Sequence, residues 1–158
     1  MTVVSNTTPL NYLLLIGRVD VLSALYERVV IPQAVFRELT SDAAPETVKA
    51  WMANAPSWLT IGKAASIMDP ELDQIQIGER EAILLAEHIQ ADFIILDDRK
   101  ARRIARDRRL NVIGTIGILT AGAKKGLINL GEALDDLKQT NFRASSELLE
   151  LLVQQNRE

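Results

Sequence analysis

Residues 91–105 read ADFIILDDRKARRIA, and this stretch indicates the fold of the whole chain. Its apolar run, residues 93–96, is typical of a short buried strand, and the basic residues after it have the apolar spacing of a helix. Another short apolar run follows at residues 111–113. Strand, helix and strand in close succession predict an α/β fold, in which helices cover both faces of a parallel sheet.

The same alternation continues toward both ends of the chain. Further strands are expected at residues 3–4 and 29–31, with a marginal edge strand at residues 59–61. Because no repeat or linker divides the chain, we expect one domain over residues 1–158, with a core over about residues 3–127 and C-terminal helices over 128–156. Helices are expected at residues 7–16, 19–26, 33–40, 46–53, 79–89, 99–108, 116–125, 130–139 and 145–155.

Composition excludes several classes of chemistry. The 158 residues are 47% hydrophobic and 25% charged, and a chain of this length can form a core without disulfides or structural zinc. The absence of cysteine excludes thiolate metal sites and cysteine nucleophiles, and the single histidine, His88, excludes a multi-histidine zinc site. The apolar N-terminal stretch is short and interrupted, so we expect no signal peptide, no membrane partner and a cytoplasmic location.

The net charge of −3 hides a strongly basic segment. Residues 99–109, RKARRIARDRR, contain seven basic side chains and one acid, for a local charge of +6. A phosphate backbone responds to such a local field more than to the total charge, so we predict a nucleic-acid-binding helix; the alternative is a solvated basic face. The residues predicted to contact nucleic acid are Arg99, Lys100, Arg102, Arg103 and Arg106, while Ala101, Ile104 and Ala105 are expected to pack inward.

Polar residues follow the expected strands or lie in the helices next to them. Ligands of parallel α/β sheets bind at the carboxyl ends of the strands, where such side chains can meet. If several carboxylates do meet there, they repel each other unless a hard cation such as Mg²⁺ or Mn²⁺ neutralises them, and such clusters serve phosphoryl transfer. The positions are Ser5-Asn6-Thr7, Glu38, Glu79 with Glu81, and Asp97-Asp98.

Each acidic residue also has a simpler explanation. Glu38 falls about 140° around its helix from Gln33, within the apolar arc, so its carboxylate must be paired, protonated or bound to a cation. A salt bridge would satisfy it. Glu79 and Glu81 are acids in the first turn of a helix, where the helix dipole favours them. Either Asp97 or Asp98 could be the N-cap of the helix that begins at Arg99, and a cap requires only one of them. The other aspartate then has no capping role.

Four motifs together resemble the PIN-domain family. They are VVSNTTPL at residues 3–10, IPQAVFREL at 31–39, GEREAILLA at 78–86, and the stretch at 91–105. Within the family the chain is similar to the short stand-alone VapC-type toxins. The resemblance implies a three-layer α/β/α fold with a central parallel sheet, and an acidic cluster that binds Mg²⁺ or Mn²⁺ and cuts RNA.

The resemblance also assigns site residues and partners. The family's acids fall on Asn6, Glu38, Glu81 and Asp98, with Asp97 as the alternative to Asp98, and its hydroxyl falls on Thr7. Glu81 is favoured over Glu79, which becomes a supporting residue, because Ala82 follows it. The expected metal ligands are thus Asn6, Glu38, Glu81 and Asp98, and the expected catalytic residues are Glu38, Glu81, Asp97 and Asp98.

Asn6 departs from the family pattern, because the usual residue there is aspartate. Two functions follow: a metal-dependent ribonuclease acting as the toxin of a VapBC-type pair, or a weakened PIN domain that binds RNA or a protein. In either case the resemblance implies a homodimer and a small antitoxin protein as partners. A nucleotide-binding Rossmann-like protein is disfavoured, because no GxGxxG loop follows the first expected strand.

Overall fold

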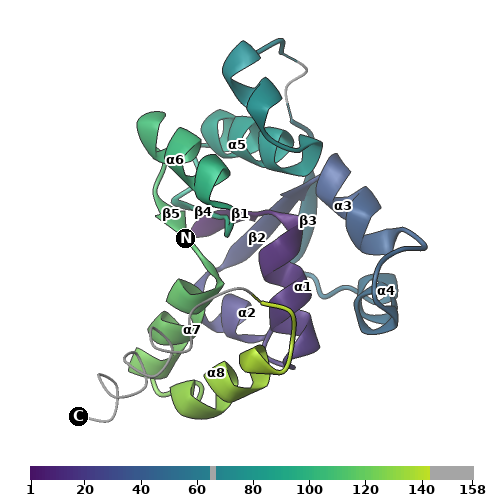
Figure 1. The fold of residues 1–158 in the computed structure, drawn as a ribbon, viewed down its shortest axis with the longest axis vertical. Coiled ribbons are helices and arrows are strands. Elements are labelled where there is room, and N and C mark those ends of the chain that lie inside the picture. The colour runs from purple at the N-terminus through teal and green to yellow at the C-terminus, as the bar shows by residue number, and fades with distance from the viewer. Residues whose placement is uncertain (65–66, 143–158) are drawn as a thin grey trace.

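Five short strands form one parallel sheet in the order β3-β2-β1-β4-β5 (Figure 1). The computed structural model describes residues 1–64 and 67–142. Every expected strand is present, and β3 forms an edge of the sheet as expected. The strands are β1 (Thr2–Ser5), β2 (Arg28–Pro32), β3 (Leu59–Gly62), β4 (Phe93–Ile95) and β5 (Val112–Ile113).

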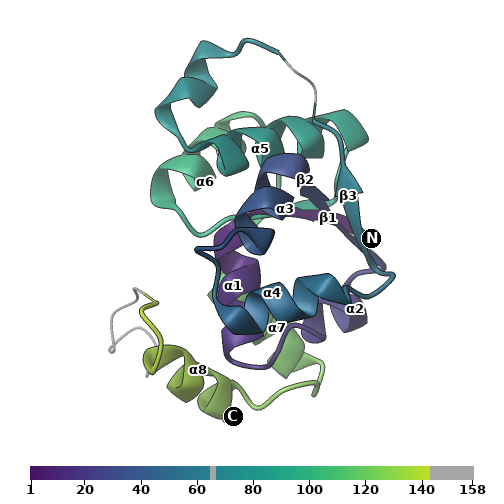
Figure 2. The same ribbon diagram turned by 90° about the vertical axis from the view of Figure 1, so that its right-hand side faces the viewer.

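Helices cover both faces of the sheet, which gives three layers (Figure 2). Two helices, α5 (Ile77–Ile89) and α6 (Arg99–Asp107), pack on one face. The expected α/β/α fold class is therefore confirmed. The other face is covered by α1 (Thr7–Leu15), α2 (Val21–Leu25), α3 (Gln33–Thr40), α4 (Glu46–Ala53), α7 (Thr115–Lys124) and α8 (Leu130–Lys138).

The central strand β1 contributes to both hydrophobic cores. Val3 and Val4 are both fully buried, and because side chains alternate along a strand they face opposite sides of the sheet. On α6 the expected inward residues Ala101, Ile104 and Ala105 are buried against the second core. The basic side chains of α6 are consequently confined to its outer surface and its ends.

The chain reverses its direction of travel across the sheet at β1. From β1 it proceeds to β2 and β3 on one side, and it then crosses back to place β4 and β5 on the other. In a parallel α/β sheet this topological switch point leaves a crevice outside the carboxyl ends of the two neighbouring strands. The crevice here lies beyond Ser5 of β1 and Ile95 of β4, which are paired in register.

The segment between β3 and α5 carries a short 3-10 helix, η1 (Pro70–Gln74), that hydrophobic periodicity does not reveal. Arg108, just after α6, holds it in place. The Arg108 guanidinium lies 2.8 Å from Asp69 Oδ2, 3.0 Å from Glu71 Oε1 and 2.6 Å from Glu87 Oε1 on α5. These three carboxylates raise the pKa of Arg108 above its usual value.

Two further sequence expectations concern a C-terminal helix and the crossing of a membrane. The helix expected over residues 145–155 lies outside the described residues. In the part that the structure describes, no helix combines the length and the apolar character that crossing a membrane requires.

Candidate active site

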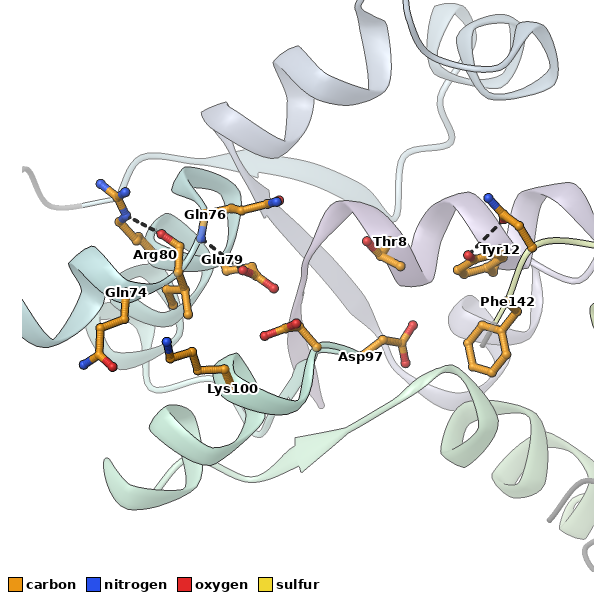
Figure 3. Close-up of a pocket in the computed structure, with 12 residues that line it drawn as sticks. Thr8, Tyr12, Gln74, Gln76, Glu79, Arg80, Asp97, Lys100 and Phe142 are labelled. Carbon is orange, nitrogen blue, oxygen red and sulfur yellow. Dashed lines mark hydrogen bonds between the residues drawn. The ribbon is translucent and has the colours of Figure 1, made fainter. Parts of the chain in front are cut away.

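A pocket of about 1070 Å³ opens at the switch point (Figure 3). Asn6 is the N-cap of α1, and its backbone N–H donates a hydrogen bond to the Ile95 carbonyl at 3.1 Å. This bond joins the carboxyl ends of β1 and β4. The pocket is lined by Thr8, Tyr12, Gln74, Ile75, Gln76, Glu79, Arg80, Asp97, Asp98, Lys100, Asn141 and Phe142.

Glu38 of α3 lies at this site because a hydroxyl group binds its carboxylate and a glycine leaves room for it. The Thr7 hydroxyl donates a hydrogen bond to Glu38 Oε2, so the half-buried carboxylate is satisfied without a salt bridge. A Cβ atom on Gly78 would lie 2.9 Å from Glu38 Oε1 and 3.2 Å from Asn6 Oδ1. The absent side chain of Gly78 therefore leaves a space that both oxygens face.

Glu79 is the acid of α5 that faces the pocket (Figure 3). Only 7% of the residue is exposed, and its Oε1 accepts a hydrogen bond from the Gln76 backbone N–H at 3.1 Å in a capping box. Burial raises the pKa of Glu79 above its usual value, and the negative charges of Asp98 and Glu38 raise it further. These acids are therefore close enough to repel each other.

Glu81 has a different position from the one predicted for it. Its Oε1 accepts a hydrogen bond from the Ala34 backbone N–H at 3.0 Å, and its Oε2 lies 3.9 Å from Arg37 Nη2, so Glu81 binds α3 at both its first and its last turn. Two residues along a helix turn the direction by about 200°, which separates Glu81 from Glu79. The small residue after Glu81 gave no information on this direction. The capping-box spacing from Gln76 to Glu79 is the signal that could have identified Glu79.

The two aspartates after β4 have separate roles. Both oxygens of Asp97 accept hydrogen bonds from Thr115, from its N–H at 2.8 Å and its hydroxyl at 2.5 Å, which ties β4 to α7. Burial raises the pKa of Asp97, while the Thr115 hydrogen bonds and the charge of Arg102 oppose that shift. Asp98 is exposed and is the N-cap of α6, with Oδ2 accepting from the Ala101 N–H at 2.9 Å. Asp98 is thus the more accessible of the pair.

The basic helix α6 is only partly available to a ligand. Arg102 was predicted to contact nucleic acid, but its Nη1 donates to the Leu96 carbonyl at 2.8 Å, so it supports the turn after β4. Burial and the neighbouring Arg106 lower the pKa of Arg102. The remaining predicted contacts are exposed, and Lys100 also lines the pocket; they are Arg99, Lys100, Arg103 and Arg106.

The donor set fits a divalent ion that keeps part of its water shell. Carboxylate and amide oxygens are the ligands that Mg²⁺ and Mn²⁺ prefer, and the space at Gly78 is faced by one of each. Within residues 1–64 and 67–142, no three acidic or histidine side chains lie close enough together to hold one metal ion. The predicted set of Glu38, Glu81 and the aspartates is therefore not gathered into one coordination sphere.

Fold and site together define a three-layer α/β domain with an acidic cleft at its switch point and a basic helix beside it. The chain belongs to the PIN-domain family, because a family model described as PIN domain matches residues 2–158. PIN domains are generally nucleases and generally use divalent metal ions.

A solved structure supports the fold. A PilT N-terminus domain protein from the hyperthermophilic archaeon Sulfolobus solfataricus is similar with a TM-score of 0.52 and 15% sequence identity, over 92% of this chain and 100% of that chain. At this identity the likeness extends to the fold alone. No curated protein matches the chain significantly.

Proposed function

We propose that the protein is a metal-dependent ribonuclease that acts as the toxin of a VapBC-type toxin–antitoxin pair. The observation that supports this activity best is the proximity of three carboxylates beside the exposed basic side chains of α6. Glu79 and Asp98 line one pocket, and Glu38 lies near enough to Glu79 to raise its pKa. Negative charges that raise the pKa of Glu79 favour a bound cation, and the adjacent positive charge suits a polyanionic substrate.

The proposed direct ligands of Mg²⁺ or Mn²⁺ are Glu38 and Asn6, whose oxygens face one space, and Glu79 and Asp98 would bind the ion through its water molecules. When bound, such an ion lowers the pKa of a water molecule and stabilises charge on the phosphate. The chain's own residues orient the site: Thr7 fixes the Glu38 carboxylate, and the Gln76 N–H fixes Glu79. We assign positioning roles to Asp97 and Glu81, because both are engaged by neighbouring elements.

The substrate is held by charge. Lys100 lines the pocket beside Asp98, and Arg99, Arg103 and Arg106 extend the same positive surface along α6. Lysine and arginine side chains contact phosphate groups without reading the base sequence, so these residues would position RNA of any sequence.

We further propose that the protein is cytoplasmic, forms a homodimer and is held inactive by a small antitoxin protein. Its resemblance to the short stand-alone PIN domains supports these partners. Reading the neighbouring gene tests the pairing: a short upstream gene that encodes a DNA-binding protein is expected. Size measurement in solution tests the dimer.

The activity is tested by a matched pair of variants on α5. Glu79→Gln removes a charge from the pocket, whereas Glu81→Gln removes one from the turn that binds α3; both amides keep a hydrogen-bond acceptor. Cleavage of a mixed single-stranded RNA is measured across a Mg²⁺ and Mn²⁺ titration. We expect Glu79→Gln and Asp98→Ala to abolish cleavage and Glu81→Gln to retain it. Cleavage that survives EDTA or Asp98→Ala would contradict the metal-carboxylate mechanism.

A second function is favoured by one specific observation at the first family position. Asn6 carries no charge there, and the described residues contain no group of three acids placed to hold an ion. A PIN domain that binds RNA or a protein partner without cutting would have this site. It predicts no cleavage by the natural protein at any metal concentration.

A further inference from the structure

The pocket ends in an aromatic pair that the ribonuclease chemistry does not use (Figure 3). Tyr12 of α1 and Phe142 have ring centroids 4.9 Å apart and lie edge to face at 87°. The Tyr12 hydroxyl donates a hydrogen bond to Asn141 Oδ1 at 3.0 Å, which fixes its ring. Both rings are half-buried, so each keeps part of its surface toward the pocket.

The lining of the pocket changes in character along its length (Figure 3). Arg80 and Lys100 lie at one end, the carboxylates of Glu79 and Asp97 lie between, and the aromatic pair is at the other end. The two cations are the only ones among the described lining residues. No described cation lines the aromatic end of this pocket, and its rings offer an apolar surface on which a nucleobase can stack.

We propose that Tyr12 and Phe142 form a subsite for one unpaired nucleobase of the RNA substrate, an inference that rests on the proposed function. One helical turn separates Thr8 from Tyr12, about 6 Å along α1, so the stacked base belongs to a nucleotide next to the one at the carboxylates. Asn141 places a side-chain amide beside the rings, where it can bond a base edge. The subsite makes single-stranded RNA the preferred substrate, because a paired base cannot enter it.

Binding without cleavage tests the subsite. A short single-stranded oligoribonucleotide is compared in EDTA with an oligomer of equal length whose nucleotides are all abasic, so the two differ only in their bases. The variants are Phe142→Leu, which removes the ring, and Phe142→Trp, which keeps one. Trp58→Leu is the matched control, since Trp58 belongs to another half-buried aromatic pair, with Trp51, and does not line this pocket.

The natural protein is expected to bind the base-bearing oligomer between about fivefold and about a hundredfold more tightly, the range that stacking of one base contributes. Phe142→Leu should remove this preference, and Phe142→Trp and Trp58→Leu should retain it. Two results would overturn the subsite: equal binding of both oligomers by the natural protein, or a preference that persists in folded Phe142→Leu. The aromatic pair would then serve packing or a protein partner.

The oligomer comparison distinguishes a failure of the nucleobase subsite from a failure of the proposed ribonuclease function. If Phe142→Leu does not fold, the comparison of oligomers on the natural protein still decides the matter. Binding of both oligomers with equal affinity, together with metal-dependent cleavage, would remove the subsite and keep the ribonuclease. Binding of neither oligomer at low salt would overturn the RNA substrate and the subsite together.

Discussion

Gly78→Ala should separate the stability of this protein from its activity. Gly78 is the second residue of α5, and alanine at a compatible helical position stabilises a protein by roughly 0.5–1 kcal/mol relative to glycine. The new Cβ would lie 2.9 Å from Glu38 Oε1, inside ordinary van der Waals separation, so the carboxylate must move by about 0.5 Å or more. That movement strains the hydrogen bond from Thr7, which as a bond to a charged group contributes about 1.5–3 kcal/mol.

Because the gain offsets part of the loss, the free energy of unfolding should fall by no more than about 2.5 kcal/mol. The rate of RNA cleavage should fall by up to about a hundredfold, because a displacement of about 1 Å in a catalytic site can cost that much. Chemical denaturation measures the first quantity, and RNA cleavage across a Mg²⁺ titration measures the second.

Gly131→Ala is the control for this prediction, because Gly131 is the second residue of α8, away from the carboxylates (Figure 1). It should leave cleavage unaltered. Full activity of Gly78→Ala at low Mg²⁺ would refute the placement of Glu38 at the metal.

Three more perturbations probe the charges of the site. Asn6→Asp keeps an N-cap and adds a negative charge beside the proposed cation, an interaction on the order of a few kcal/mol before desolvation; isothermal titration should show tighter Mg²⁺ binding, and unchanged affinity would remove Asn6 from the ligand set. Replacing Arg103 and Arg106 together by alanine should weaken RNA binding for all sequences and reduce the slope of log affinity against log salt by about 1.4; an unchanged slope would assign the helix to another partner. The raised pKa of Glu79 stabilises the metal-free fold below the usual glutamate pKa of 4.5, and this contribution is lost as pH rises through the folded pKa. Glu79→Gln should therefore unfold with a flatter dependence on pH, as followed by urea denaturation, and an identical pH profile would contradict the burial of this carboxyl group.

Local pattern was sufficient to predict most of the elements. The bounds expected for the helices at residues 33–40 and 46–53 agree with α3 and α4, and the short apolar runs agree with the strands to within one or two residues. Strand alternating with helix also predicted the parallel sheet correctly, because consecutive parallel strands require a crossover. The short 3-10 helix η1 and its ion pairs with Arg108 have no comparable periodic signal in the sequence.

The amino-acid sequence was thus enough to predict the fold class, the family resemblance and the polar positions near the strand ends. Which of those side chains meet depends on the packing of distant elements. Glu79 faces the pocket and Glu81 faces α3, and Arg102 supports the turn after β4, because a side chain's neighbours depend on how a helix is rotated against elements distant in sequence. Phe142 reaches Tyr12 across 130 residues of chain for the same reason, and no local pattern contains that contact.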